Sequence, residues 1–74
     1  MPRPLVTLSP GETAKVTAVG GDPGAARRLM DLGLIRGTSI RVVRVAPLGD
    51  PIEVMLRGFL LTLRRAEAEH VAVE

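Results

Sequence analysis

The sequence predicts a mainly β protein. We expect a small, strongly twisted barrel or sandwich of about five short strands, with one short α-helix inserted after the first long strand. Short runs that alternate apolar with polar residues recur between turns rich in Gly and Pro. Only one segment, "DPGAARRLMDLG", spaces its apolar residues as a helix does. Because no strand–helix–strand unit recurs, a doubly wound parallel sheet is disfavoured.

Composition limits the class of protein. The 74 residues are enough for one domain, which we expect to span residues 1–74. The absence of cysteine excludes disulfides and thiolate metal sites. We find no apolar run long enough to span a membrane and no signal peptide, so we expect a cytoplasmic protein. The net charge of +2 does not select nucleic acid as a partner, and the single aromatic residue, Phe59, cannot build a stacking platform.

The chain begins with a predicted turn and strand. The Pro-Gly pair of "LSPGE" (8–12) fits the centre of a type II turn. "TAKVTAV" (13–19) alternates small or apolar residues with polar ones, which indicates a strand. "GGDPG" (20–24) then precedes a helix, as a phosphate loop does. It lacks the Lys-Ser/Thr ending of such loops, and Asp22 would repel a phosphate.

The helix is predicted to run from Pro23 to about Leu32. Asp22 is its expected N-cap, and Pro23 suits the first position because its missing N–H costs nothing there. Gly33 supplies a left-handed stop, after which Leu34 is placed to pack on Leu29, as in a Schellman motif. Helical periodicity gives one apolar face, with two further apolar residues on its shoulder: Ala25, Leu29 and Leu32, then Ala26 and Met30.

The second half is predicted to be mostly β. The expected elements are a strand at 39–46, a loop at 47–51, strands at 52–57 and 59–64, one helical turn at 65–70 and a closing strand at 71–73. Arg57-Gly58 fits a two-residue hairpin turn. That turn pairs residue 52 with 63, 54 with 61 and 56 with 59, and these six form a predicted core face: Ile52, Val54, Leu56, Phe59, Leu61 and Leu63.

Little in the sequence indicates enzymatic chemistry, and we expect no catalytic residues. No serine has a visible histidine and acid partner. The acidic residues that lie close together in the sequence are interpreted as solvent-exposed charges. His70 is the only histidine. With Glu67 and Glu69 it is a weak candidate for a metal ligand, because metal sites usually combine several such residues at a recognisable spacing. The ordinary alternative is a surface histidine that leads into the last strand.

The arginines on the predicted helix allow two interpretations. Arg27 is spaced i,i+4 from Asp31, and Arg28 is spaced i,i+3 from it, so weak ion pairs on a solvated face are expected. An Arg-rich surface beside exposed Met55 and Leu60 would also suit a protein partner. Composition alone does not decide between them.

Three strings identify a family resemblance. "RRLMDLGLIRG" (27–37), "APLGDP" (46–51) and "LRR" (63–65) follow one another at a characteristic distance. With them, nearly the whole chain resembles the FeoA family of small ferrous iron transport accessory proteins. This resemblance implies an SH3-like β-barrel with a helical insertion, in agreement with the fold predicted from the residues.

The resemblance also implies a partner. FeoA-like proteins act with the FeoB ferrous iron permease, whose cytoplasmic portion includes a GTP-binding domain, so this chain would reach the membrane only through that partner. No cofactor is expected, and ligand spacing does not support association with Fe²⁺. On exposure and composition, we predict a contact surface on the helix, the following turn and the 48–50 loop: Arg27, Arg28, Asp31, Leu34, Arg36, Leu48 and Asp50.

Several alternatives stay open. The chain could be a module that binds or delivers a transition metal through His70, Glu67 or Glu69. It could be a small nucleic-acid-binding barrel, or the SH3-like domain of an iron-dependent repressor. The start at Met1 and the end at Glu74 favour a stand-alone accessory protein over a repressor fragment. A homo-oligomer is also compatible with the sequence.

Overall fold

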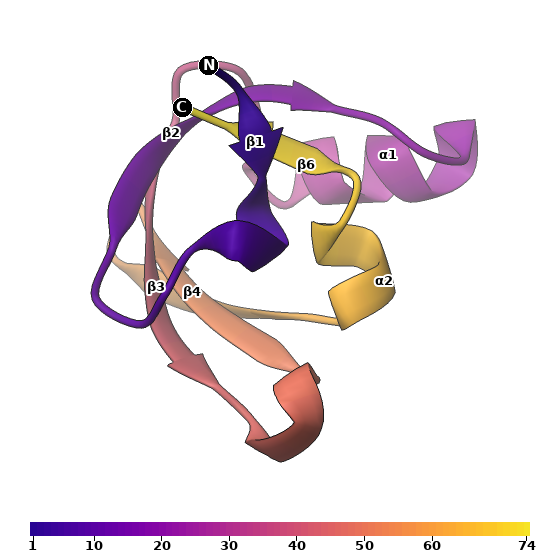
Figure 1. The fold of residues 1–74 in the computed structure, drawn as a ribbon. Helices are drawn as coiled ribbons and strands as arrows, with labels where there is room; N and C mark the ends of the chain where they lie inside the picture. The colour runs from indigo at the N-terminus through magenta and orange to yellow at the C-terminus, as the bar shows by residue number, and fades with distance from the viewer.

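A computed structural model describes residues 1–74. It contains six strands, two α-helices and two short 3-10 segments (Figure 1). In chain order these are β1 (Arg3–Pro4), η1 (Leu5–Thr7), β2 (Thr13–Val19), α1 (Pro23–Asp31), β3 (Ser39–Val45), η2 (Pro47–Gly49), β4 (Ile52–Leu56), β5 (Phe59–Leu63), α2 (Arg65–Ala68) and β6 (Val71–Val73).

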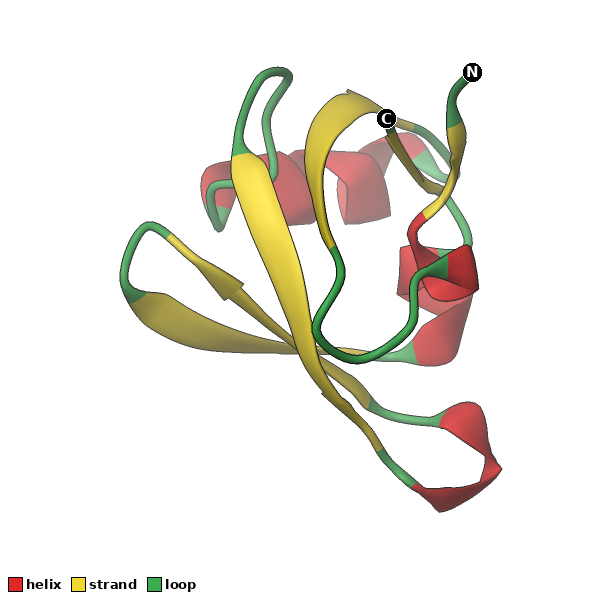
Figure 2. Ribbon diagram, turned by 60° about the vertical axis from the view of Figure 1, so that its left-hand side comes forward, coloured by secondary structure: helices red, strands yellow, loops and turns green.

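All strand pairs are antiparallel, in the order β1-β6-β2-β3-β4-β5. The register shifts once within β2, between Val16 and Ala18, and once within β3, between Val42 and Arg44. Such irregularities increase the local twist, and the sheet bends strongly (Figure 2). Helix α1 and the β3–β4 loop lie at opposite ends of the molecule, with α2 between them (Figures 1 and 2).

The predicted local chemistry of α1 is confirmed at both ends. The Asp22 carboxylate accepts a hydrogen bond of 3.1 Å from the Ala25 backbone N–H, as an N-cap does. At the other end, Gly33 has a φ of 109° and donates to the carbonyl of Met30, while the N–H of Leu34 donates to the carbonyl of Leu29 at 3.1 Å. This pair of bonds is the Schellman motif expected from the sequence.

The predicted hairpin is also confirmed. Ile52 pairs with Leu63, and the register continues residue by residue to Leu56 and Phe59. Arg57 and Gly58 both have positive φ values, 48° and 82°, which is the type I′ geometry whose twist matches that of the strands.

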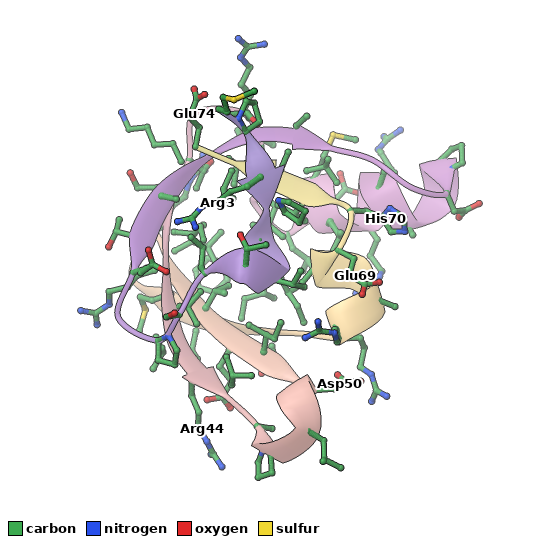
Figure 3. All side chains as sticks on the ribbon, in the orientation of Figure 1. Arg3, Arg44, Asp50, Glu69, His70 and Glu74 are labelled. Atoms are coloured by element: carbon green, nitrogen blue, oxygen red, sulfur yellow. The ribbon has the colours of Figure 1, made fainter.

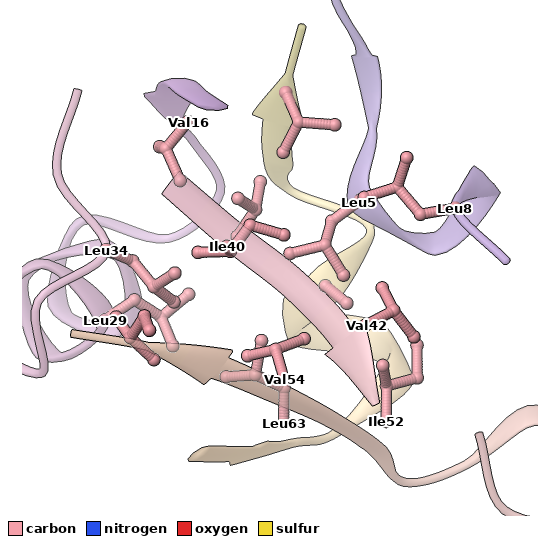
Figure 4. Close-up of a cluster of buried hydrophobic side chains, with 14 residues drawn as sticks. Leu5, Leu8, Val16, Leu29, Leu34, Ile40, Val42, Ile52, Val54 and Leu63 are labelled. Atoms are coloured by element: carbon pink, nitrogen blue, oxygen red, sulfur yellow. The ribbon is translucent and has the colours of Figure 1, made fainter. Parts of the chain in front are cut away.

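Fourteen buried apolar residues form one core (Figure 4). They come from the sheet, both helices, the N-terminal segment and the turn after α1, and together they form one contiguous core. They are Leu5, Leu8, Val16, Leu29, Leu34, Ile40, Val42, Ile52, Val54, Leu56, Leu63, Ala68, Val71 and Val73.

A sixth strand joins the roughly five predicted ones, because residues 3–4 pair with β6, and η1 follows them. Three details of the predicted core are wrong. The helix buries Ala26 and Leu29, whereas Ala25 is exposed and Met30 is substantially exposed. Periodicity groups residues by face, but the docking of the helix on the sheet decides which face is buried. Phe59 is 44% exposed at the turn end of β5, which is the edge strand of the sheet.

Candidate partner-binding surface

Helix α2 is joined to α1 by an ion pair. The Arg28 guanidinium contacts the Glu67 carboxylate, whose side chain is only 18% exposed. The other oxygen of that carboxylate accepts a hydrogen bond of 2.9 Å from the Arg64 backbone N–H, at the start of α2. Glu67 therefore caps its own helix and holds the outer face of α1 at the same time.

Helix α2 is joined to the β3–β4 loop by Asp50. One oxygen of the Asp50 carboxylate accepts a hydrogen bond of 3.1 Å from the Arg65 backbone N–H. The other lies 3.6 Å from the Arg64 guanidinium. Figure 3 shows Asp50 between the loop and α2. These two contacts therefore fix the base of the loop against α2.

Leu48 stands at the tip of this loop. Ala46 to Gly49 form a turn closed by a 2.9 Å hydrogen bond from the Gly49 N–H to the Ala46 carbonyl, with Pro47 at its second position. Leu48 takes the third position with a φ of 71°, a conformation that normally favours glycine or asparagine. Its side chain is fully exposed. A strained leucine that packs on nothing is a feature that points to function rather than to folding.

These elements form one surface, which we name the α1–α2–loop surface. It carries four ion pairs, between Arg27 and Asp31, Arg28 and Glu67, Arg64 and Asp50, and Arg65 and Glu69. Leu48 lies at its edge. The link from Asp50 to α2 spans 15 residues and has no local signal in the sequence, so residue patterns missed it.

The other predicted contact residues are placed differently. Arg27 lies 3.5 Å from Asp31, as expected, whereas Arg28 turns to Glu67. Arg36 is exposed in the turn between α1 and β3. Leu34 is completely buried, because the Schellman motif turns its side chain into the core. It therefore drops out of the candidate surface.

The three weak metal candidates do not converge. Glu67 is engaged by Arg28, and Glu69 lies 3.7 Å from Arg65. His70 lies on the connection between α2 and β6 (Figure 3) and packs against Gly21. The chain contains no group of three or more His, Cys, Asp or Glu side chains that could hold a metal ion. The residues present do not fit a site with three protein ligands.

One carboxylate has a clearly shifted pKa. The pKa of Glu12 is lowered from its ordinary value of 4.5, first by the hydrogen bond of 2.6 Å from the Ser9 backbone N–H and then by Arg3. The Arg3 guanidinium lies 3.2 Å from the carboxylate. This pair fixes the N-terminal segment on the turn before β2, away from the α1–α2–loop surface.

Neither helix of the structure has the length and apolar character required to cross a membrane.

Comparison with known proteins gives relatives that differ in size. A fusion of Fe(2+) transport protein A with the Fe(2+) transporter FeoB, from Porphyromonas gingivalis, is 33% identical over 70 residues. The match covers 95% of this chain but only 8% of the fusion protein. The chain therefore corresponds to a small part of that relative.

Solved structures agree in fold. FeoA from Chlorobium tepidum is 55% identical, with a TM-score of 0.89 over 96% of this chain and 68% of that one. FeoA from Stenotrophomonas maltophilia, solved with zinc and described as a procaryotic SH3 domain protein, is 32% identical, with a TM-score of 0.84 over 96% of this chain and 88% of that one. The predicted SH3-like fold is thus confirmed.

A manganese-dependent transcriptional repressor shares the fold alone. It is 23% identical, with a TM-score of 0.90 over 99% of this chain and 36% of the repressor. The FeoA domain, in contrast, matches residues 3–74. With this match and the similarities above, the chain belongs to the FeoA domain family.

Proposed function

We propose that this protein is a non-catalytic adaptor of ferrous iron uptake that binds the cytoplasmic portion of a FeoB-type permease. The observation that carries this proposal is the relative in which an FeoA unit and FeoB share one polypeptide. Covalent linkage raises the effective concentration of one module beside the other, which benefits modules that act together. In this proposal the adaptor is cytoplasmic and is recruited to the membrane by the permease.

The adaptor would act by shifting an equilibrium of the permease between conformations or assembly states. Binding can do this only through a difference in affinity for the two states. The α1–α2–loop surface suits that task, because its ion pairs fix two helices and a loop in one arrangement. A preorganised surface loses little conformational freedom on binding.

Within this surface we assign the apolar anchor to Leu48, at the loop end, and the charged contacts to Arg27 and Arg28, on α1. Arginine is enriched among the residues that contribute most of the binding free energy at protein interfaces, and an exposed apolar side chain gains free energy when a partner's pocket removes it from water. Leu48 is fully exposed in a loop that Asp50 holds in place, so it can enter a pocket on the partner without prior rearrangement.

The test is co-purification with the cytoplasmic portion of a FeoB-type permease. Leu48→Gly removes the anchor and fits the φ of 71° better than leucine does. The variant should therefore keep its fold, while its affinity for the permease falls by at least about tenfold, which corresponds to roughly 1.4 kcal/mol of binding free energy. Arg27→Glu reverses a charge whose only ion pair is the exposed one with Asp31. It should weaken binding as well.

Arg44→Glu is the matched control, because Arg44 is exposed on β3 and forms none of the six ion pairs. Circular dichroism checks the fold of each variant. If Leu48→Gly and Arg27→Glu both bind as the parent does, this surface is not the contact. If the parent itself fails to bind, the adaptor proposal is wrong.

A further inference from the structure

An open hollow lies where the turn before β3 meets the β4–β5 turn. Its volume is about 470 Å³. No apolar residue lines it. The lining residues are Arg36, Gly37, Thr38, Ser39 and Arg57.

The positive charge of this hollow is not neutralised within the protein. Arg36 and Arg57 take part in none of the six ion pairs. Lys15 and Arg41 add to it: Lys15 pairs directly with Ser39 across β2 and β3, and Arg41 is two residues further along the same face of β3. Neither of these residues forms an ion pair either.

The acidic residues are engaged elsewhere. Seven of the eight accept a hydrogen bond or form an ion pair with groups that do not line the hollow, namely Glu12, Asp22, Asp31, Asp50, Glu67, Glu69 and Glu74. The eighth, Glu53, is the register partner of Arg44, beyond the bulge of β3. The cations of the hollow therefore face solvent without an internal counter-ion.

One of the two guanidiniums is held in position. The Arg57 guanidinium donates to the Thr38 hydroxyl at 3.4 Å, and that hydroxyl donates to the Gly33 carbonyl at 3.2 Å. Thr38 is only 6% exposed and is the one buried polar residue of the chain. The Arg57 side chain is thus tied to the end of α1 across the hollow.

The charged donors that the hollow offers to a ligand are side chains. The backbone N–H groups of Gly37 and Thr38 already donate to Val16 and Ile35, at 2.7 and 3.1 Å. The guanidiniums of Arg36 and Arg57 and the Ser39 hydroxyl remain. A planar guanidinium group can donate two parallel hydrogen bonds to two oxygens of a phosphoryl group. These bonds are strong because both the donor and the acceptor are charged.

We propose that this hollow binds a phosphoryl group, with Arg36 and Arg57 as the charged ligands and Ser39 as a neutral donor. Both a free small-molecule phosphate and a phospholipid headgroup carry that chemistry. The site goes beyond the adaptor function and does not depend on it, since the ligand is tested on the isolated protein.

The first experiment titrates the ¹⁵N-labelled protein with inorganic phosphate at constant ionic strength. We expect saturable shifts confined to the amides of residues 36–39 and 57–58, with a Kd on the order of 1 mM because both guanidiniums are solvated. Arg57→Asn removes the charge with a residue that tolerates positive φ, and Arg36→Gln removes the other. Each should weaken binding several-fold, and the double variant at least about tenfold.

The control is Arg44→Gln, an exposed arginine outside the hollow, which should bind phosphate as the parent does. If the control variant binds phosphate as weakly as the Arg36 and Arg57 variants do, the effect is general charge attraction and the proposed site is wrong. A parent spectrum without saturable shifts would overturn it as well.

The second experiment separates the two sources of the group. Vesicles of phosphatidylcholine, with and without phosphatidylglycerol, are sedimented with the protein. If the parent binds the anionic vesicles and the Arg36→Gln, Arg57→Asn double variant does not, the site is assigned to a headgroup. Phosphate binding without vesicle binding assigns it to a soluble phosphate compound. Vesicle binding that the double variant retains contradicts a headgroup role for the hollow.

Discussion

The carboxylate of Asp50 accepts a hydrogen bond of 3.1 Å from the backbone N–H of Arg65, and this bond connects the β3–β4 loop to the first turn of α2. Asp50→Ala should free the loop and cost about 1 kcal/mol of stability, as the loss of a helix-capping group does. Urea unfolding measures the loss, and hydrogen exchange should be faster in the loop. Asp50→Asn retains an acceptor oxygen and should lose less. Equal stability of all three proteins would show that the bond does not fix the loop.

Glu67 and Arg28 should not be equivalent, although they form one ion pair. Glu67→Ala removes both the contact with Arg28 and the cap on the Arg64 N–H, so we expect a loss of about 1 to 2 kcal/mol. Arg28→Ala removes only a partly exposed pair and should cost less than about 1 kcal/mol. Chemical unfolding of the two variants compares them. A larger loss for Arg28→Ala would contradict the capping role of Glu67.

Gly21 and Gly11 offer a matched pair of substitutions. Both have nearly the same φ, 90° and 93°, so alanine at either position adds backbone strain of about 1 to 3 kcal/mol. A Cβ at Gly11 would meet nothing within 4 Å, whereas one at Gly21 would lie 2.9 Å from Cγ of His70. We therefore expect Gly21→Ala to be the more destabilising in thermal unfolding. The excess should disappear in a His70→Ala background, and its persistence there would contradict the predicted clash.

Glu12 should make the protein less stable in acid. Its folded-state pKa lies below the ordinary value of 4.5, so the folded state favours the charged form. The resulting stabilisation is present above 4.5 and is lost as the pH falls through the lowered pKa. In a series of Tm values against pH, Glu12→Gln should be less stable than the parent at neutral pH. The difference should shrink in acid, and a difference independent of pH would contradict this origin.

Metal binding tests the alternative of direct iron delivery. Because Glu67 and Glu69 are engaged by arginines and His70 packs on Gly21, we expect no stoichiometric binding of Fe²⁺ at micromolar concentration. An anaerobic titration of the isolated protein measures this. Stoichiometric binding that His70→Ala abolishes would favour the delivery module over the adaptor.

Features encoded within a few residues could be predicted from the sequence. The N-cap at Asp22, the stop at Gly33 and the turn at Arg57-Gly58 depend on local backbone geometry, and each is confirmed. The hairpin turn also fixed the pairing from Ile52 to Leu63 without knowledge of the rest of the sheet.

Features that depend on docking could not be predicted in this way. The two-residue strand β1 has no alternation to detect, and it is a strand only because β6 lies beside it. Periodicity could not choose between Ala25 and Ala26, nor place Phe59 at an edge. The bond of Asp50 to α2 and the hollow beside Thr38 join segments far apart in the sequence, so they emerge only from the fold.

The Schellman motif at the end of α1 also limits how this segment can vary in length. Leu29 and Leu34 are both buried and lie on either side of the Gly33 stop. One residue inserted or deleted between Leu29 and Gly33 would rotate Leu29 by about 100° relative to the stop and turn it out of the core. The outer positions of α1 can change in chemistry, but the number of residues from Leu29 to Gly33 is fixed, so length variation has to occur outside this stretch.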